Sequence, residues 1–405
     1  MNKTVFATGE ANYATILQNA VNEIALAGGG TLTLSAGLYY SGSVELKSNV
    51  CLCLEPGCVL KAIKGIEHFK PIGFQHLEMG STRSLLWARN ASNITLCGTG
   101  TIDLSDEYFY DFSVIKPFDI PEEQLTPAMR AECVVKRKYD MEQMISQPLF
   151  FESCEQIRVQ DLRLLHAPCW TLTFSRCRDV FVTGVTIQNR RITGNSDGIH
   201  LSAVTNAVIT GCSITAGDDC VAATCITAPD DWCENIVISN CNFQSSSAGV
   251  RLGHLQAKVK NVCVSNLNIT KSNRGVAIFA HNGGVVQNVQ LHHLNIQTRL
   301  QCGAWWGKGE AIVLCAKGGS GLISNIEIDH ITAESDNGIL IAGDDNIQKI
   351  CLQNVAVTLR NSPNSTLLQS DYDLRPNAYL KRPGKGPFAK HIEGAEVALQ
   401  NVTFC

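Results

Sequence analysis

A loose internal repeat of short, strand-like segments is the feature of this sequence that most constrains its fold. Each segment alternates Val, Ile or Leu with polar residues, passes an Asn, Gly or Cys, and then begins a second short strand. From residue 156 onward, successive segments begin about 23 to 37 residues apart. The segments are residues 93–103, 156–165, 179–189, 206–215, 235–244, 261–270, 288–297, 325–334 and 349–358. Strand repeats with a period of roughly 20 to 50 residues predict a solenoid or a propeller.

The number of strands in each repeat distinguishes these two architectures. A propeller blade needs four strands in about 40 to 45 residues, whereas each repeat here has room for two or three. The sequence therefore predicts an all-β parallel β-helix, in which each coil buries its Val, Ile and Leu residues against the neighbouring coils. We also expect the Asn residues that precede many strands to adopt the left-handed conformation and to stack as a ladder.

The repeat and its interruptions define a single domain with three parts. A helix over about residues 11–27, followed by three glycines, is predicted to cap the open end of the first coil. A charged segment that contains several prolines interrupts the repeat and is predicted to be a long loop with one or two short helices beside the groove. The predicted parts are the cap (about 1–30), the coils (about 31–358, with the insertion 104–147) and an irregular segment with a last strand (about 359–405).

Composition narrows the possible functions. The 405 residues carry a net charge of −4, so the overall composition lacks the excess of basic residues that is typical of nucleic-acid-binding proteins. Binding of an acidic saccharide would require a local basic patch. No apolar run approaches the ~18 residues of a membrane span. The 18 cysteines form no paired CxxC motifs at zinc spacing, so no metal site is expected, and nothing indicates a cofactor. The N-terminus lacks the pattern of an export signal, which predicts a cytoplasmic protein whose reduced thiols are small core residues.

Three aspartates in consecutive repeats are the strongest candidates for catalytic residues. Asp197 and Asp218 lie 21 residues apart, close to one coil, so we expect them to stack about one strand spacing, near 4.8 Å, apart. Gly217 provides the freedom for a bend that brings Asp218 and Asp219 to one surface. Clustered carboxylates differ in pKa, which supplies an acid and a base at one pH. The competing interpretation is that these are turn residues, as in a second Gly-Asp-Asp at 343–345.

The motifs Asn195-Ser196-Asp197 and Gly217-Asp218-Asp219 resemble the Asn-x-Asp and Gly-Asp-Asp motifs of glycoside hydrolase family 28, the polygalacturonase family. Further similarity covers residues 98–103, 167–172, 245–253, 272–278 and 304–312. The resemblance implies a right-handed parallel β-helix and hydrolysis of glycosidic bonds with inversion. It also implies that Asp218 is the general acid, and that Asp197 and Asp219 hold and deprotonate the attacking water. Inverting chemistry needs a gap of roughly 6.5–9.5 Å between acid and base.

Two motifs of that family are replaced in this chain. Gly-His-Gly becomes Ser247-Ala248-Gly249, and Arg-Ile-Lys becomes Ala277-Ile278-Phe279. The second replacement removes the cations that grip the galacturonate carboxylate, so the substrate is either a uronate held by other cations or a neutral sugar. Candidates for substrate binding are Asn195, His200, Arg251, Arg274, His254, His281 and Trp305. The arginines and histidines among them also have a structural interpretation, as surface charges or hydrogen-bonded groups.

Three hypotheses for function follow. The first is a cytoplasmic glycosidase for short, pectin-derived or related oligosaccharides, with loops at 104–147 and around 300–310 that wall off the groove and favour exo action. The second keeps the fold but makes the protein a polysaccharide lyase, with Ca²⁺ on the Asp cluster, or a transferase- or epimerase-type enzyme. The third is a non-catalytic, carbohydrate-binding β-helix. An oligosaccharide is the ligand in each case, and the sequence leaves the oligomeric state open.

Overall fold

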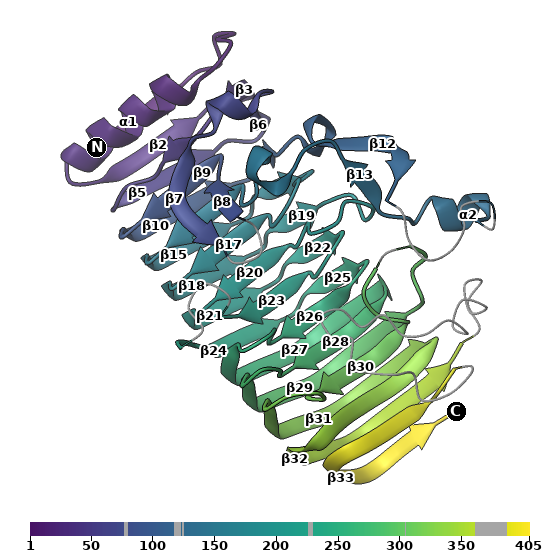
Figure 1. Ribbon diagram of the computed structural model, residues 1–405. Coiled ribbons are helices and arrows are strands. Elements are labelled where there is room, and N and C mark those ends of the chain that lie inside the picture. The colour runs from purple at the N-terminus through teal and green to yellow at the C-terminus, as the bar shows by residue number, and fades with distance from the viewer. Residues whose placement is uncertain (77–79, 117–122, 124, 226–229, 304, 361–386) are drawn as a thin grey trace.

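Parallel strands stacked in three ladders form the body of the molecule (Figure 1). The computed structural model describes residues 1–405 except 77–79, 117–122, 124, 226–229, 304 and 361–386. Among the described residues, 29 strands join one system of parallel pairs, because each coil contributes a strand to each ladder in turn. The predicted right-handed parallel β-helix is confirmed.

The three ladders are called the first, second and third sheets. The first sheet contains β4 (Val44–Glu45), β9 (Leu86–Arg89), β14 (Leu149–Glu152), β17 (Leu172–Ser175), β20 (Ile199–Ser202), β23 (Val221–Thr224), β26 (Ala248–Leu252), β28 (Arg274–Phe279), β30 (Glu310–Cys315) and β32 (Asn337–Leu359). The second contains β1 (Asn2–Val5), β2 (Gly30–Leu34), β5 (Val50–Leu54), β10 (Ser92–Gly98), β15 (Glu155–Gln160), β18 (Arg178–Thr183), β21 (Thr205–Thr210), β24 (Trp232–Ser239), β27 (Lys258–Ser272), β29 (Val285–Thr298), β31 (Leu322–Ser335) and β33 (Lys390–Phe404). The third contains β3 (Gly37–Ser41), β6 (Cys58–Ala62), β11 (Thr101–Asp103), β16 (Arg163–Leu165), β19 (Thr186–Gln188), β22 (Ser213–Ala216) and β25 (Asn242–Ser245). The long strands β27, β29 and β31 each span the second and third sheets, and β32 continues from the first sheet into the other two.

The first sheet is buried on both of its faces, which distinguishes it from the second. Every residue of β17, β20 and β23 is buried, whereas β18 and β21 alternate buried residues with partly or fully exposed ones. Inside the coil, Leu172, Ile199 and Val221 stack in register and belong to one continuous apolar core. Because the outer face of the first sheet is also covered, other segments of the chain must pack over it, and the candidate site lies there.

Asparagines stack at the turns that begin the second sheet, as the sequence predicts. The chain adopts positive φ angles of 61°, 57° and 56° at Asn206, Asn235 and Asn261. Each side chain donates to the one before it, with Nδ2 to Oδ1 distances of 3.1 Å from Asn235 to Asn206 and 3.0 Å from Asn261 to Asn235. Asn288 and Asn325 continue the ladder at 3.0 and 2.8 Å. Asparagine suits these positions because it tolerates the left-handed conformation and its amide is both donor and acceptor.

A single helix covers the N-terminal end of the coils (Figure 1). Helix α1 (Ala14–Leu26) falls within the predicted range and ends where the N–H groups of Gly28 and Gly29 bond to Ala25 O and Ile24 O. Its inward face buries Leu17, Ala20, Val21 and Ile24. The last predicted strand is also present, as β33 paired with β32. No helix among the described residues is long and apolar enough to cross a membrane.

The insertion after β11 contains more structure than the sequence indicates. Where the sequence predicts one or two short helices, the described residues of the insertion contain three helical segments, η2 (Asp106–Tyr108), α2 (Pro127–Arg130) and η4 (Met141–Gln143). Between them, β12 (Tyr110–Ile115) and β13 (Val135–Arg137) form an antiparallel pair that the sequence does not predict, because the strands are short and lie far apart in the chain. The pair stands at one side of the coil stack, where Val135 N–H bonds to Ile192 O in the loop after β19 (Figure 1). A smaller hairpin, β7 (Pro71–His76) and β8 (Gly80–Arg83), follows η1 (Ile66–His68).

Most cysteines lie inside the coils. Twelve of the 18 are buried, five are half-buried and only Cys405 is exposed. Several stack on neighbouring coils, as where Cys212 N–H approaches the Cys241 Sγ at 3.3 Å. Their burial agrees with the interpretation of cysteine as a small core residue. The predicted irregular segment at 359–394 lies largely outside the described residues.

Candidate active site

The two carboxylate motifs lie on adjacent coils of the first sheet. Ile199 pairs with Val221, and the Gly198 N–H donates to Asp219 O at 2.8 Å. Asp197 therefore neighbours Asp219 across one strand spacing, so the register differs by one residue from the predicted stacking of Asp197 with Asp218. Asp197 is 1% exposed, Asp218 8% and Asp219 0%. Burial of three carboxylates together requires nearby cations or hydrogen-bond donors, because isolated buried charges are costly.

Arg251 supplies the cation for this cluster. Its Nε donates to Asp219 Oδ2, and its Nη2 lies 4.0 Å from Asp197 Oδ2. The other Asp219 oxygen accepts the Ala248 N–H at 3.1 Å. Arg251 starts one coil beyond the aspartates, in register with Ala222, and the small alanine leaves space for the long side chain to pass. Arg251 does not line the pocket and pairs with the carboxylate cluster, so its role in substrate binding stays a prediction.

His200 contacts Asp197 and helps to orient its carboxylate. Its Nδ1 lies 3.2 Å from Asp197 Oδ2, and its Nε2 lies 2.9 Å from Thr224 Oγ1 on the next coil. Trp170 stacks on the imidazole, with ring centroids 3.6 Å apart and an angle of 13° between planes. His200 is fully buried, so it acts on a ligand through Asp197 rather than by direct contact. Trp170 is itself buried, at 2% exposure, and packs within the protein.

Asp218 is the one carboxylate of the three that lines a pocket. The pocket has a volume of about 780 Å³, and Asn195, Ser247 and Trp305 share its lining with Asp218. Ser245 Oγ donates to Asp218 O at 2.5 Å, which fixes the backbone of the Gly-Asp-Asp turn. The rest of the lining comes mainly from the insertion, residues 110–143. Asp218 therefore faces the cavity while Asp197 and Asp219 lie beneath it.

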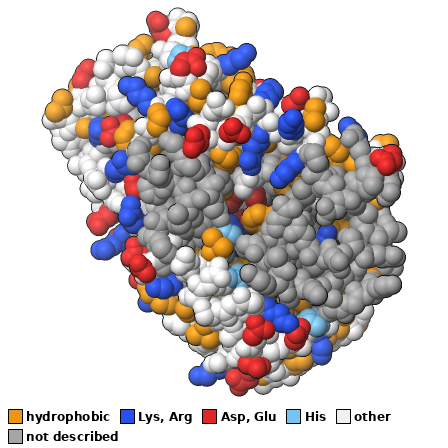
Figure 2. All heavy atoms as spheres, in the orientation of Figure 1, with side chains coloured by type: hydrophobic (Ala, Val, Ile, Leu, Met, Phe, Trp, Pro, Cys, Tyr) orange, Lys and Arg blue, Asp and Glu red, His pale blue; other side chains and the backbone are white. Residues whose placement is uncertain are grey.

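The insertion and the loop at 299–310 meet and close the pocket on one side. Glu132 joins them, since its carboxylate pairs with Arg299 and its backbone O accepts the Trp305 Nε1–H at 2.7 Å. Trp306 adds a second indole to the pocket lining. Figure 2 shows Lys and Arg side chains gathered over β12 and β13, along the edge of a hollow. The insertion and the 299–310 segment therefore form a continuous border on this side of the pocket.

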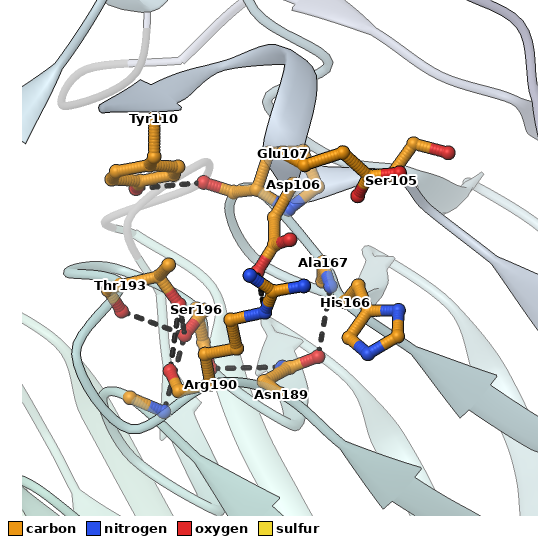
Figure 3. Close-up of polar contacts among 12 residues, drawn as sticks. Ser105, Asp106, Glu107, Tyr110, His166, Ala167, Asn189, Arg190, Thr193 and Ser196 are labelled. Atoms are coloured by element: carbon orange, nitrogen blue, oxygen red, sulfur yellow. Dashed lines mark hydrogen bonds and ion pairs between the residues drawn. The ribbon is translucent and has the colours of Figure 1, made fainter. Parts of the chain in front are cut away.

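Buried polar residues hold the loop that carries Asn195 and Asp197 (Figure 3). Asn189 accepts the Ala167 N–H at 2.9 Å and donates to Ser196 O at 3.1 Å. Ser196 Oγ accepts the Gly217 N–H at 3.1 Å, which ties the first motif to the second. These positioning residues were missed by sequence reasoning, because nothing in their spacing separates them from ordinary turn residues.

A fourth aspartate lies beside this loop. Asp106, on η2, is completely buried and points toward Arg190, whose Nε lies 3.5 Å from Asp106 Oδ2 (Figure 3). Burial raises the pKa of Asp106 to about 6, although the Arg190 charge acts to lower it. The insertion is fixed to the same loop by Tyr110, whose hydroxyl lies 2.8 Å from Gly194 O and 2.9 Å from Pro168 O. Asp106 thus belongs to the attachment of the insertion and not to the pocket lining.

Besides His200 and Arg251, three further residues that the sequence predicts to bind substrate lie away from the pocket lining. Arg274 is 1% exposed, with its Nε 3.5 Å from Glu310 Oε2 on the next coil. His254 and His281 are each 4% exposed and do not line the pocket. Burial lowers the pKa of His281 to about 4, so its imidazole is neutral at neutral pH. Arg274, His254 and His281 are therefore enclosed by other parts of the protein and do not face the pocket.

The positions of the missing family cations are apolar. Ala277 and Phe279 are buried in a small cluster on the first sheet with Val313, Leu340 and Phe388. Ala277 lies in register with Arg251, one coil further along. The two replaced positions therefore belong to a buried apolar cluster, and the Arg274 guanidinium lies 5.4 Å from the centre of the Phe279 ring.

Comparison with known proteins identifies the family. The model of "Glycosyl hydrolases family 28" matches residues 133–367, more than half of the chain, so the chain belongs to this family. A probable polygalacturonase of Vitis vinifera is 25% identical over 315 residues, which cover 72% of this chain and 58% of that protein. An endo-polygalacturonase of Pectobacterium carotovorum is 23% identical over 300 residues, covering 72% and 71%. The chain spans only 29% of a third relative, a probable polygalacturonase of Arabidopsis thaliana, at 33% identity.

Solved structures share the fold. A Thermotoga maritima exopolygalacturonase superposes with a TM-score of 0.68 at 16% identity, covering 88% of this chain and 87% of that one. A family 28 exopolygalacturonase of Yersinia enterocolitica gives the same TM-score at 14% identity, covering 99% and 78%. At these identities the likeness concerns the β-helix alone.

Proposed function

We propose that the protein is an inverting glycosidase that cleaves a glycosidic bond of an oligosaccharide, with Asp218 as general acid. The observation that carries the proposal is the difference in position among the three aspartates relative to the pocket. Asp218 faces the 780 Å³ pocket, whereas Asp197 and Asp219 lie buried beside it and are oriented by Arg251 and His200. Membership of glycosyl hydrolases family 28 supports the same chemistry.

The proposed reaction assigns one step to each carboxyl group. Asp218 donates its proton to the glycosidic oxygen as the bond from that oxygen to the anomeric carbon breaks. A water molecule attacks the opposite face of the anomeric carbon, and its proton passes to Asp197. Asp219 orients this water and does not take the proton, because its two oxygens are already engaged by Arg251 and the Ala248 N–H. The product has the inverted configuration.

The shape of the pocket supports action on chain ends. The insertion and the 299–310 loop join through Glu132, so a polysaccharide running past the carboxylates would meet a wall. Trp305 and Trp306 offer ring faces on which a sugar can stack. We therefore propose exo action on a pectin-derived or related oligosaccharide. The relatives named polygalacturonase and exopolygalacturonase are consistent with such a substrate.

The hypothesis of a Ca²⁺-dependent lyase has less support. A calcium ion on the cluster would lie between carboxylates, and the guanidinium of Arg251 already lies between Asp197 and Asp219. Binding of a metal there would require displacement of a buried ion pair.

The test is a panel of oligosaccharides and 4-nitrophenyl glycosides, assayed with the wild type and Asp218→Asn. Loss of a general acid costs about 10²- to 10⁴-fold in kcat. The loss should be much smaller for 4-nitrophenyl glycosides, whose leaving group departs without a proton. Asp197→Asn should reduce the rates on both kinds of substrate, because each requires an activated water.

A matched control is available in the second Gly-Asp-Asp. Asp344 is exposed, and its carboxylate accepts the Gly318 N–H at 2.8 Å, so Asp344→Asn should leave activity unchanged. NMR of the freshly released sugar reads its anomeric configuration. Retention of configuration, or full activity of Asp218→Asn on oligosaccharides, would contradict the proposed mechanism.

A further inference from the structure

The loop over residues 190–196 is held by a chain of hydrogen bonds that connects its first residue to both carboxylate motifs (Figure 3). Arg190 O accepts the Thr193 N–H at 3.1 Å and the Thr193 hydroxyl at 2.7 Å. Ser196 Oγ donates to Thr193 O at 2.7 Å and accepts the Gly217 N–H at 3.1 Å. A change in the position of Arg190 is therefore transmitted to a residue of each motif.

The loop also packs closely on Gly217. A Cβ atom at this residue would collide with Thr193 O and would lie 2.8 Å from Arg190 O, so glycine is the residue that fits here. Gly217 directly precedes Asp218, so the carbonyl groups of the loop set the course of the backbone that leads to the proposed general acid. A loop that moved away from Gly217 would release this backbone.

Two residues of the insertion hold Arg190 in place. Its Nε lies 3.5 Å from Asp106 Oδ2, and its guanidinium carbon lies 4.5 Å from the centre of the Phe112 ring on β12 (Figure 3). Asp106 is fully buried, and among the described residues no group donates a hydrogen bond to either of its carboxylate oxygens. A buried carboxylate without hydrogen-bond donors depends on a nearby cation, so the attraction between Asp106 and Arg190 fixes the guanidinium.

We propose that Asp106 is a positioning residue of the glycosidase, which acts through Arg190 to hold the 190–196 loop and thereby sets the places of Asp197 and Asp218. This role rests on the proposed function and adds to it a residue that lies outside the pocket lining. It also gives the insertion a second task, because the segment that borders the pocket then fixes the loop that carries the first carboxylate motif.

The strength of this hold depends on the ionisation of Asp106. Burial raises the pKa of Asp106 to about 6, while the charges of Arg190 and His166 act to lower it and those of Glu107 and Asp103 add to the increase. Above pH 6 the ionised carboxylate attracts Arg190, and below pH 6 this ionic attraction is lost. The loop should therefore be held more firmly at neutral pH than at acidic pH.

Other titratable groups face the same place. His166 Nδ1 lies 3.2 Å from Asp103 Oδ1, and this contact raises the pKa of the imidazole. Lys61 pairs with Asp103 at 3.1 Å and with Glu107 at 3.0 Å. Burial raises the pKa of the Tyr110 hydroxyl, which therefore stays neutral at these pH values. His166 is thus the neighbour whose titration must be separated from that of the proposed positioning residue.

The experiment compares the wild type with Asp106→Asn at pH 5 and pH 7, on a 4-nitrophenyl glycoside that the wild type cleaves. Asparagine has nearly the same shape without the charge, so it mimics the neutral carboxyl at every pH. A partly exposed ion pair predicts a fall in kcat of about fivefold at pH 7, with little change in KM, and of less than about twofold at pH 5. The ratio of the two kcat values cancels any titration that both proteins share. A defect in packing alone would lower kcat by the same factor at both pH values, and that result would overturn the proposed role.

Variants of His166 and Arg190 assign the effect to its source. The pH dependence of the kcat ratio should persist in a His166→Gln background, and its loss there would overturn the assignment to Asp106. Arg190→Met should lower kcat at pH 7 about as much as Asp106→Asn, and the double variant should be no worse than either single variant. Arg190→Lys keeps the charge and should retain more activity than Arg190→Met. Losses that multiply in the double variant would mean that the two residues act separately, which contradicts the proposal.

Arg158 provides the matched control for the loss of one arginine. Its guanidinium carbon lies 5.5 Å from the centre of the Phe181 ring, an arrangement similar to that of Arg190 over Phe112. Arg158 is an exposed residue of β15 in the second sheet, so Arg158→Met should leave kcat unchanged at both pH values.

Hydrogen exchange of the Gly217 N–H separates this role from the proposed function, because it needs no substrate. In Asp106→Asn this N–H should exchange about fivefold faster than in the wild type at pH 7, and at nearly the same rate at pH 5. Faster exchange without hydrolysis of any glycoside would support the positioning by Asp106 and reject the glycosidase. Hydrolysis with unchanged exchange and a constant kcat ratio would support the glycosidase and reject the role of Asp106.

Discussion

Removal of the cation within the carboxylate cluster should destabilise the protein strongly. In Arg251→Met the carboxylate of Asp219 loses its guanidinium partner, and both residues are buried, at 4% and 0% exposure. Breaking a buried ion pair costs about 3–5 kcal/mol, because one charge remains without a partner in a poorly solvated place. Methionine fills most of the volume along the path beside Ala222, so the loss of packing is small.

The expected change in melting temperature follows from the size of the chain. The entropy of unfolding is about 2.1 cal/mol/K per residue, which for 405 residues gives about 0.85 kcal/mol/K. A loss of 3–5 kcal/mol then lowers Tm by about 4–6 °C if the coils melt together. Calorimetry of the wild type, Arg251→Met, Asp219→Asn and the double variant measures this effect.

The double variant tests the physical reason. When Asp219 is an asparagine, Arg251→Met no longer leaves a buried charge next to it, so the double variant should be more stable than the sum of the single effects predicts. We expect a coupling free energy of about 2 kcal/mol or more. Strict additivity, or a Tm change below about 1 °C for Arg251→Met, would refute the argument that Arg251 neutralises this cluster.

Two further predictions concern the attachment of the insertion and the turns. The pKa of Asp106 is raised to about 6 from its usual 3.8, so its contribution to stability is present below about pH 4 and is lost as pH rises through 6. Relative to Asp106→Asn, the wild type should thus lose on the order of 3 kcal/mol of unfolding free energy between pH 4 and 7. Urea titrations at both pH values measure this free energy, and a pH-independent difference in stability between the two proteins would contradict the prediction. Asn235→Ala should cost about 2–3 kcal/mol, from a left-handed φ of 57° and from its ladder bonds to Asn206 and Asn261. Asn235→Gly should recover the part of the lost stability that is due to the left-handed φ. Equal denaturant midpoints for Asn235→Ala and Asn235→Gly would contradict this expectation.

The coils could be predicted from the sequence because their contacts repeat at a nearly constant separation. Alternation of Val, Ile and Leu defines which side chains face inward, and the spacing of the repeat brings like residues into register. The asparagine ladder is predictable for the same reason, since one residue type recurs at one turn. The placement of Asp197 beside the Gly-Asp-Asp turn also follows from a separation close to one coil, although the register differs by one residue from the prediction.

The cations of the site could not be assigned in this way. Arg251 reaches back past Ala222 to a carboxylate 32 residues earlier in the chain, and only the small alanine makes this path available. Arg137 lies 58 residues from its partner Asn195, on a strand pair that has no repeat to predict it.

The sequence by itself thus determined the solenoid, its cap and the order of its carboxylates, because these depend on periodic contacts between neighbouring coils. The tertiary structure decided which carboxylate faces the pocket, which cations accompany it and how much water reaches each one. Asp106 illustrates the difference, since an ordinary aspartate in a loop acquires a pKa of about 6 only when the folded chain buries it. Desolvation and long-range charge depend on how the whole chain packs, and no local pattern of residues encodes them.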